Sequence, residues 1–259
     1  MKLVKSLCWL WLVLLIAGCH PAKVQDSTVE TNLGAPQVRL TSPKLPQIAE
    51  DLITDFEVSS TSVNGIDGGH GYYDRHYRTA TYPGGNSGPT VGIGVDLGQQ
   101  SSSVTSDSWQ SYLVANQVER FTKCAGVTGK SAQQLVKDLQ DVIVPWKSAI
   151  DEFDIYEVPN YWSLTRRTFP GFDNLTLNCQ GALVATVYNR GNSTVGNSRV
   201  DMRTLQTLIA ETPIDYKNIA NAFRHMEVTM GASWKAQGIY DGLKARYDAT
   251  AKLAETPDN

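Results

Sequence analysis

A run of apolar residues in the second half of the chain constrains the fold more than any other feature. Residues 177–188 read Leu-Asn-Cys-Gln-Gly-Ala-Leu-Val-Ala-Thr-Val-Tyr, which is apolar most of the way round a helix. A helix of this kind is usually buried in a core. The run ends at Asn189-Arg190-Gly191, where Gly191 suits the residue that follows a helix. We therefore expect one buried central helix.

The rest of the chain from Pro46 onward is also expected to be mostly helical. Proline suits the first turn of a helix, so the first helix should begin near Pro46, with Ile48, Leu52 and Phe56 on its apolar face. Apolar residues at helical spacing predict further helices over residues 106–121, 131–144, 203–208, 216–225 and 241–253.

Two segments give weaker signals. Residues 72–78 mix aromatic and charged side chains and are expected to form a strand or an irregular segment. Residues 156–172 contain two prolines and are expected to mix short helix with loop. The predicted class is α+β, predominantly α, with a small β-hairpin lobe and a helical lobe around the central helix.

A glycine-rich stretch, Thr81–Gly98, is the most informative segment for function. From Thr90 it is expected to form a strand, because apolar residues alternate with small or polar ones. The apolar face holds Val91, Ile93 and Val95. The other face carries Thr90, two glycines and Asp96, so a ligand could approach the backbone closely. An ordinary hairpin with glycines at bulges would have the same pattern.

An isolated acid, Glu57, stands at the C-terminal end of the first predicted helix. A carboxylate at that end is disfavoured by the helix dipole and does not act as a cap. Its position favours a functional carboxyl group, or one whose pKa is raised by the apolar face beside it. The alternative is a solvent-exposed glutamate at a helix end.

These side chains match the needs of a glycosidase, which uses a proton donor and a second group that activates water or attacks the sugar. Glu57 can donate the proton, and Thr90 with Asp96 can hold a water molecule. Six residues of straight strand span roughly 20 Å. Thr90 and Asp96 can therefore share one water only if the strand bends, which Gly92 and Gly94 permit.

The layout resembles that of the phage-type lysozymes (glycoside hydrolase family 24). The matching segments are Phe56-Glu57, Thr90-Val91-Gly92-Ile93-Gly94, and Ala182–Gly191 with its Tyr-Asn-x-Gly ending. Asp201-Met202-Arg203 and Gly242-Leu243-x-x-Arg246 also resemble late segments of the family. The resemblance covers residues 46–254 and implies a lysozyme-like fold.

One departure from the family pattern points to a particular branch. The usual phage-type enzymes place their catalytic aspartate six residues before the threonine, where this chain has Gly84. The chain is more similar to the muramidase domain of the bacteriocin pesticin and related bacterial proteins, in which the aspartate follows the threonine by six residues, as Asp96 does here. That match implies Glu57 as the general acid and Thr90 with Asp96 as the groups that orient or activate water.

The resemblance implies a peptidoglycan hydrolase that cleaves the β-1,4 bond between N-acetylmuramic acid and N-acetylglucosamine. We expect substrate contacts from Tyr82, Asn86, Ser87 and Asn189. The expected partners are peptidoglycan glycan strands, with no cofactor and a monomeric chain. A lytic transglycosylase and a non-catalytic peptidoglycan-binding lipoprotein on a lysozyme scaffold are the alternatives.

The first residues indicate export. Lys2 and Lys5 precede an apolar run, Leu7–Ala17, which is too short to span a bilayer. Ile16-Ala17-Gly18-Cys19 resembles the lipobox of bacterial lipoproteins, and the following His20 favours the outer membrane. We therefore expect a signal peptide over 1–18, lipidation of Cys19 with attachment to the membrane, a flexible tether over 19–45, and a folded domain over 46–259. A plain secretory signal with an incidental cysteine is the alternative. The expected location is the periplasmic side of the outer membrane of a Gram-negative bacterium.

Charge and cysteines narrow the function further. The formal net charge of -3 becomes -5 once Lys2 and Lys5 leave with the signal, which argues against nucleic acid as a partner. Cys124 and Cys179 could form a disulfide in an exported protein, or stay as buried free thiols. No metal site is expected, since His70, His76 and His225 show no ligand spacing with the cysteines.

Overall fold

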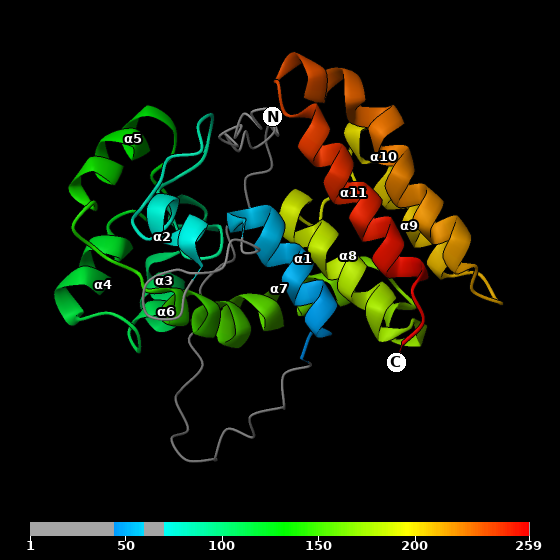
Figure 1. The fold of residues 1–259 in the computed structure, drawn as a ribbon, viewed down its shortest axis with the longest axis horizontal. Helices are drawn as coiled ribbons and strands as arrows, with labels where there is room; N and C mark the ends of the chain where they lie inside the picture. Colours follow the sequence, from blue (N-terminus) through cyan, green and yellow to red (C-terminus); the bar gives the residue numbers. More distant parts are fainter. Residues whose placement is uncertain (1–43, 60–69, 259) are drawn as a thin grey trace, which may run out of the picture.

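The structure, a computed structural model, describes residues 44–59 and 70–258 (Figure 1). It is predominantly helical, with one two-stranded antiparallel sheet, which confirms the α+β, mainly α class. Within these residues, no helix has the length and apolar character needed to cross a membrane. The predicted signal peptide, Cys19 and most of the predicted tether lie outside the described residues.

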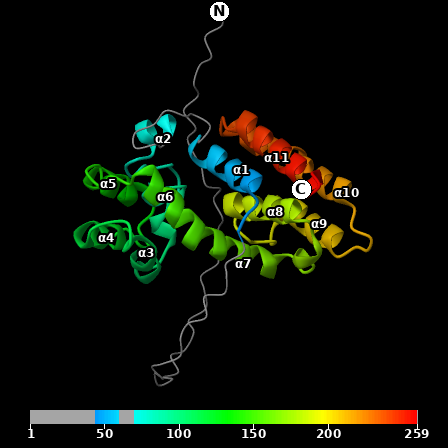
Figure 2. The same cartoon turned by 60° about the horizontal axis from the view of Figure 1, so that its bottom comes forward.

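The helices fall into two lobes joined by one long helical segment (Figures 1 and 2). The hairpin lobe contains α2 (Gly71–His76), β1 (Thr90–Val91), β2 (Val95–Asp96), η2 (Leu97–Gln99), α3 (Ser102–Trp109), α4 (Ala115–Thr122), α5 (Gly129–Asp138) and α6 (Trp146–Glu152). The connecting segment is η3 (Phe153–Glu157) with α7 (Val158–Thr168), followed by η4 (Phe172–Asn174). The helical lobe contains α1 (Gln47–Val58), α8 (Leu177–Arg190), η5 (Asn197–Arg199), α9 (Val200–Ile209), α10 (Tyr216–Ala236) and α11 (Tyr240–Glu255).

Helix α8 is the buried central helix that the sequence predicts. Every residue from Asn178 to Val187 is buried, and the helix packs against α1, α7 and α11. Thr176 caps its first turn by accepting a hydrogen bond from the Cys179 N–H. Gly191 ends it with a φ of 71°, a conformation that glycine adopts without strain.

Close packing of α1 on α8 requires a glycine. A Cβ atom on Gly181 would lie 2.5 Å from the Cβ of Ala49, so a side chain there would force the two helices apart. The buried stripe of α1 is accordingly Ala49, Ile53 and Glu57, at helical spacing. The prediction that Ile48 belongs to the apolar face is wrong, because α8 meets the neighbouring stripe and leaves Ile48 half exposed.

The single helix predicted over 106–121 is wrong, because the chain turns between α3 and α4. In one straight helix, Trp109 and Phe121 would lie about 18 Å apart at 1.5 Å per residue. The turn instead brings their ring centroids to 5.6 Å in an edge contact, with both rings buried. Burial of the two rings thus favours two short helices over one long one.

The segment 72–78 is helical in its larger part, forming α2, where the sequence suggested a strand or an irregular segment. The Tyr73 hydroxyl donates to the Val144 carbonyl, and the Val144 N–H donates to the Arg78 carbonyl at 2.8 Å. These bonds hold Val144 against Tyr73 of α2 and against Arg78, which follows α2. The helix predicted over 131–144 accordingly stops at Asp138, and the chain leaves the helical path before it reaches Val144.

Helices α9, α10 and α11 were all predicted, and each is longer than its predicted range. Residues 158–168 form one continuous helix with Pro159 in its first turn, more regular than the predicted mixture of helix and loop. Helix α10 runs eleven residues beyond the predicted end at His225, and α9 and α11 include the ranges predicted for them.

Cys124 and Cys179 are both buried free thiols, so the disulfide that the sequence allowed does not form. Cys124 follows α4 in the hairpin lobe, whereas Cys179 lies on α8 in the helical lobe. Burial raises the pKa of Cys124 to about 11 and that of Cys179 to about 12. Both side chains therefore serve as small apolar residues in the core.

The contact between α1 and α8 generates a stability prediction. We expect Gly181→Ala to lower the free energy of unfolding by about 1–3 kcal/mol, because the added methyl group overlaps Ala49. Thermal unfolding followed by circular dichroism measures this. The matched control is Gly231→Ala in α10, where the nearest atom, at 3.3 Å, belongs to the Tyr240 ring. Equal melting temperatures for the two variants would contradict the packing argument.

Candidate active site

The glycine-rich stretch folds as a tight hairpin. Strands β1 and β2 pair antiparallel, with Thr90 opposite Asp96 and Val91 opposite Val95. The chain reverses at Gly92 and Gly94, whose φ values are +58° and +75°. The straight strand predicted from Thr90 is therefore wrong, and the chain bends at the two glycines that permit a bend.

Both faces of the hairpin keep the character that the sequence indicates. Val91, Ile93 and Val95 are all buried, as predicted. Residues directly opposite in an antiparallel pair carry their side chains on one face, with Cβ atoms about 5 Å apart. Thr90 and Asp96 are thus neighbours on the polar face.

Asp96 is held in place by backbone donors. Its Oδ1 atom accepts hydrogen bonds from the N–H groups of Gly88 and Gly98, both at 2.9 Å. A Cβ on Gly88 would lie 2.5 Å from that oxygen and closer still to Gly98, so only glycine fits there. Burial raises the pKa of Asp96, and these N–H donors oppose the rise in part.

Glu57 lies against the turn of the hairpin. The position of a Cβ on Gly94 is 2.9 Å from Glu57 Oε2, so the glycine leaves room for the carboxyl group. The Tyr188 hydroxyl of α8 donates to the Ile93 carbonyl and ties the same turn to the helical lobe. The solvent-exposed glutamate considered as an alternative is excluded, since Glu57 is only 8% exposed.

The charge of Glu57 is balanced by Arg246 of α11. Arg246 Nη2 donates to Glu57 Oε1 at 2.6 Å, and both side chains are buried. Burial raises the pKa of Glu57, while the positive charge and hydrogen bond of Arg246 lower it, and the net direction is upward. The carboxyl group can therefore hold a proton more readily than free glutamate, beside a cation that stabilises its ionised form.

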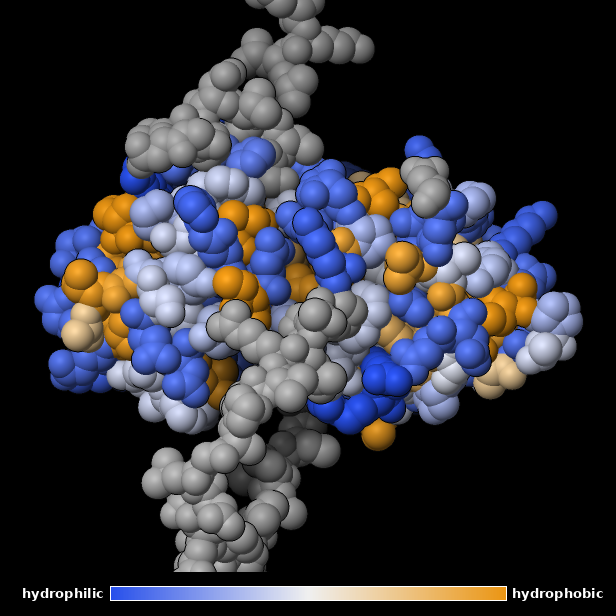
Figure 3. All heavy atoms as spheres, turned by 90° about the horizontal axis from the view of Figure 1, so that it is seen from below, coloured by the Kyte–Doolittle hydropathy of each residue, from blue (hydrophilic) through white to orange (hydrophobic). Residues whose placement is uncertain are grey.

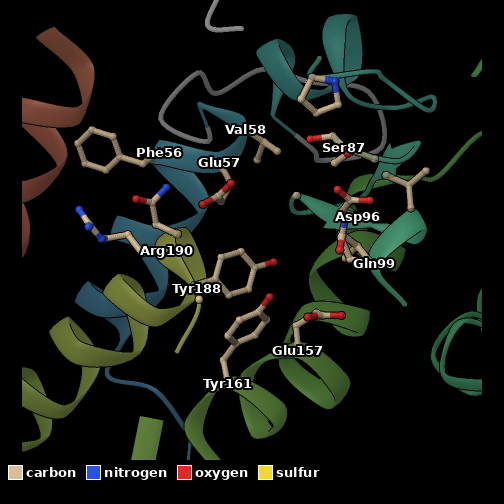
Figure 4. A pocket seen from close by; sticks show the side chains of 18 of the residues that line it. Phe56, Glu57, Val58, Ser87, Asp96, Gln99, Glu157, Tyr161, Tyr188 and Arg190 are labelled. Carbon is tan, nitrogen blue, oxygen red and sulfur yellow. The ribbon is translucent and has the colours of Figure 1, made fainter. Parts of the chain in front are cut away.

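The two carboxyl groups face each other across one cleft. It has a volume of about 1030 Å³, and its lining includes Glu57, Thr90 and Asp96. Figure 4 shows Glu57 on the wall formed by α1 and Asp96 on the opposite wall. The structure thus brings all three predicted catalytic residues together around one space.

Two of the four predicted substrate-binding residues line this cleft, namely Ser87 and Asn189. Tyr82 and Asn86 do not line it. The Tyr82 hydroxyl donates to the Gly85 carbonyl within its own loop, and Asn86 is an exposed residue whose carbonyl accepts a hydrogen bond from Gln99. The prediction that Tyr82 and Asn86 belong to the same site as Ser87 and Asn189 therefore does not match the lining of this cleft.

The hydrophobicity of the molecular surface points to a binding site less clearly than the cleft does. On the face shown in Figure 3, hydrophobic side chains occur in small groups among hydrophilic ones. Apolar side chains scattered in this way are usual on protein surfaces.

Glu157 is a cleft residue that the sequence analysis missed. It accepts a hydrogen bond from the Gln100 amide at 3.0 Å, and burial raises its pKa to about 7. Glu152 is completely buried. Burial and the charge of Glu157 together raise the pKa of Glu152 well above its usual value.

The π-helical turn η3 explains why these two acids interact. In an α-helix, residues five apart point in different directions, whereas a π turn places them one above the other. Glu152 directly precedes this turn and Glu157 is its last residue, at the junction between α6 and α7. No α-helical pattern in the sequence would have paired them.

Comparison with known proteins provides a partial match without an assigned activity. A family model described as a domain of unknown function (DUF8812) matches residues 61–151. That range includes Thr90, Asp96 and nearly the whole hairpin lobe, and it leaves out Glu57 and α8. No curated protein matches the chain.

The buried acid pair predicts a pH-dependent stability. Both carboxyl groups have pKa values above the usual 4.5, and that of Glu157 is about 7. The folded protein therefore binds more protons than the unfolded chain from about pH 4.5 upward, and stability falls as the pH rises through 7. We expect Glu152→Gln to flatten this fall and to raise the melting temperature at pH 8 by at least about 3 °C.

Melting curves between pH 5 and pH 8 test this expectation. Glu211→Gln is the matched control, because it makes the same change at an exposed position. A Glu152→Gln variant with the same pH slope as the unaltered protein would show that the pair does not titrate in this range.

Proposed function

We propose that the chain is a peptidoglycan hydrolase with a lysozyme-like fold, which cleaves the β-1,4 bond between N-acetylmuramic acid and N-acetylglucosamine. One observation carries the proposal. Glu57 and Asp96 come from different lobes and face each other across a cleft, with Thr90 paired beside Asp96. A helical lobe around a buried central helix, next to a small hairpin lobe, supports the lysozyme-like fold.

Glu57 is proposed as the proton donor. Its raised pKa favours the protonated form that a general acid needs. When the proton passes to the glycosidic oxygen, the carboxylate that remains is stabilised by the Arg246 guanidinium 2.6 Å away. Burial thus favours the protonated form of Glu57 before the transfer, and Arg246 stabilises the ionised form after it.

Asp96 and Thr90 are proposed to hold the attacking water on the opposite wall. The threonine hydroxyl can both donate and accept a hydrogen bond, and the carboxylate can accept a proton from the water. The backbone donors at Gly88 and Gly98 occupy Oδ1 and so fix how the carboxylate is turned. A raised pKa makes Asp96 a stronger base once it is ionised.

The remaining parts of the proposal concern partners and location. Glycan strands of peptidoglycan are the proposed partner, and the chemistry needs no cofactor. From the sequence pattern at residues 1–19, we propose that a monomeric domain is anchored through lipidated Cys19 at the periplasmic side of the outer membrane.

Replacement of the proposed acid gives the direct test. We expect Glu57→Gln to slow the clearing of purified sacculi at least about 100-fold, since general acid catalysis contributes that much or more. Asp96→Asn on the opposite wall should cause a comparable loss. Glu50→Gln makes the same change on α1 outside the cleft and should keep full activity.

Stability must be measured beside activity, because Glu57→Gln leaves the buried Arg246 with a neutral partner. Asp96→Asn does not disturb that ion pair, so it separates lost chemistry from lost folding. Undiminished clearing by both variants would refute the assignment.

Mass spectrometry of the released muropeptides distinguishes hydrolysis, which adds a water, from transglycosylation, which leaves an anhydro sugar. Binding to sacculi without any clearing would indicate a non-catalytic protein.

The lipid anchor has its own test. We expect Cys19→Ala to abolish incorporation of labelled palmitate and to release the protein from the membrane fraction. Cys8→Ala, which lies within the predicted signal peptide, is the matched control and should change neither result. Continued labelling of the Cys19→Ala variant would contradict the lipoprotein assignment.

A further inference from the structure

Two arginines line the cleft beyond the C-terminal end of α8. Arg190 is the last residue of that helix, and Arg199 stands at the start of α9. They are close enough for the charge of Arg190 to lower the pKa of Arg199. Throughout residues 44–59 and 70–258, no carboxylate forms an ion pair with either of them.

Arg190 is fixed by its surroundings. Its guanidinium lies 6.0 Å from the centre of the Tyr247 ring, and that ring stacks on Trp234 with a centroid distance of 5.6 Å. The Arg190 guanidinium also donates to the carbonyl of Ser198, the residue before Arg199. Figure 4 shows the Arg190 side chain turned away from the space between Glu57 and Asp96. The pair of arginines therefore belongs to one end of the cleft.

Arg199 is held in an environment that disfavours its charge. The side chain is only 5% exposed, and its Nη1 atom is buried without a hydrogen-bond partner. Burial lowers its pKa first, and the charge of Arg190 lowers it further. Arg199 is also the N-cap residue of the ten-residue helix α9, where the helix dipole favours negative charge.

An anion bound between Arg190 and Arg199 would offset the burial of the Arg199 charge, its repulsion by Arg190 and the unfavourable helix dipole. It would pair with a buried cation, reduce the repulsion between two cations, and meet the positive end of a helix. A planar guanidinium matches a carboxylate with two parallel hydrogen bonds. Asn189, next to Arg190, accepts a hydrogen bond from the Tyr247 hydroxyl through Oδ1, and its amide nitrogen can still donate.

We propose that Arg190 and Arg199 form an anion subsite that binds a carboxylate of the muramic acid residue, either on its lactyl arm or on the peptide attached to that arm. The subsite rests on the proposed function, since it deepens the choice of substrate at the same cleft. It distinguishes peptidoglycan from a neutral glycan such as chitin, because N-acetylglucosamine carries no carboxylate.

Binding to uncleaved ligands tests the subsite without turnover. Three ligands are titrated into the full-length chain by calorimetry or by NMR. The first is the N-acetylglucosaminyl–N-acetylmuramic acid disaccharide with its free lactyl carboxylate, the second is the same disaccharide carrying a peptide, and the third is neutral N,N′-diacetylchitobiose. Arg199→Gln should weaken binding of a carboxylate ligand about tenfold or more and leave chitobiose unchanged. The ligand that loses affinity identifies the source of the carboxylate.

Two further variants provide controls. Arg199→Lys keeps the charge and should retain more affinity than Arg199→Gln. Arg166→Gln removes one positive charge from an exposed ion pair with Asp173 and should change no affinity.

Stability separates binding from a structural role. A structural arginine would stabilise the ligand-free protein, whereas an unpaired buried cation opposes folding. We expect the ligand-free Arg199→Gln variant to melt at the same temperature or higher. A lower melting temperature with unchanged affinity for both carboxylate ligands would overturn the proposal.

The two proposals can be tested apart. If the unaltered chain clears no sacculi but its affinity for a carboxylate ligand depends on Arg199, the subsite stands and the hydrolase assignment falls. If sacculi are cleared and Arg199→Gln binds every ligand as before, the subsite alone falls.

Discussion

The buried carboxyl group of Glu57, packed against the hairpin turn and paired with Arg246, is the constraint on which the rest of the structure depends. Its stripe on α1 meets α8 through the Ala49–Gly181 contact, its charge requires a cation from α11, and its outer oxygen requires a glycine at position 94. A buried charge without these partners would destabilise the fold by several kcal/mol. Helix α1, the hairpin and α11, which are far apart in the sequence, are therefore brought together at the Glu57 carboxyl group.

The features that the sequence predicted well are those set by local chemistry. Helix α8 is buried because it is apolar on every side, and Gly191 ends it for a steric reason. The alternation of Val91, Ile93 and Val95 correctly identified the buried face of the hairpin, although the chain turns there instead of running straight. Two-residue periodicity survives a tight turn, so it predicts which side chains are buried better than it predicts strand length.

The features that the sequence did not predict depend on contacts between distant segments. The Trp109–Phe121 contact breaks a predicted helix, and the bonds from α2 to Val144 shorten another. The pairing of Glu152 with Glu157 needs a π turn, which has no simple sequence pattern. Likewise, Arg190 and Arg199 resemble ordinary charged residues until the fold shows one of them buried without a partner. The family match to residues 61–151 contains the Asp96 wall of the cleft alone, so the site as a whole is visible only in three dimensions.

The placing of the glycan between Glu57 and Asp96 can be seen in a crystal structure of the Asp96→Asn variant with a bound N-acetylmuramic acid–N-acetylglucosamine tetrasaccharide. We expect the glycosidic oxygen to lie about 3 Å from the Glu57 carboxyl group, within hydrogen-bond reach. We also expect a water between that bond and the Thr90 hydroxyl on the opposite wall. A glycan bound outside the cleft, or one whose glycosidic oxygens all lie beyond hydrogen-bond reach of Glu57, would contradict this placing.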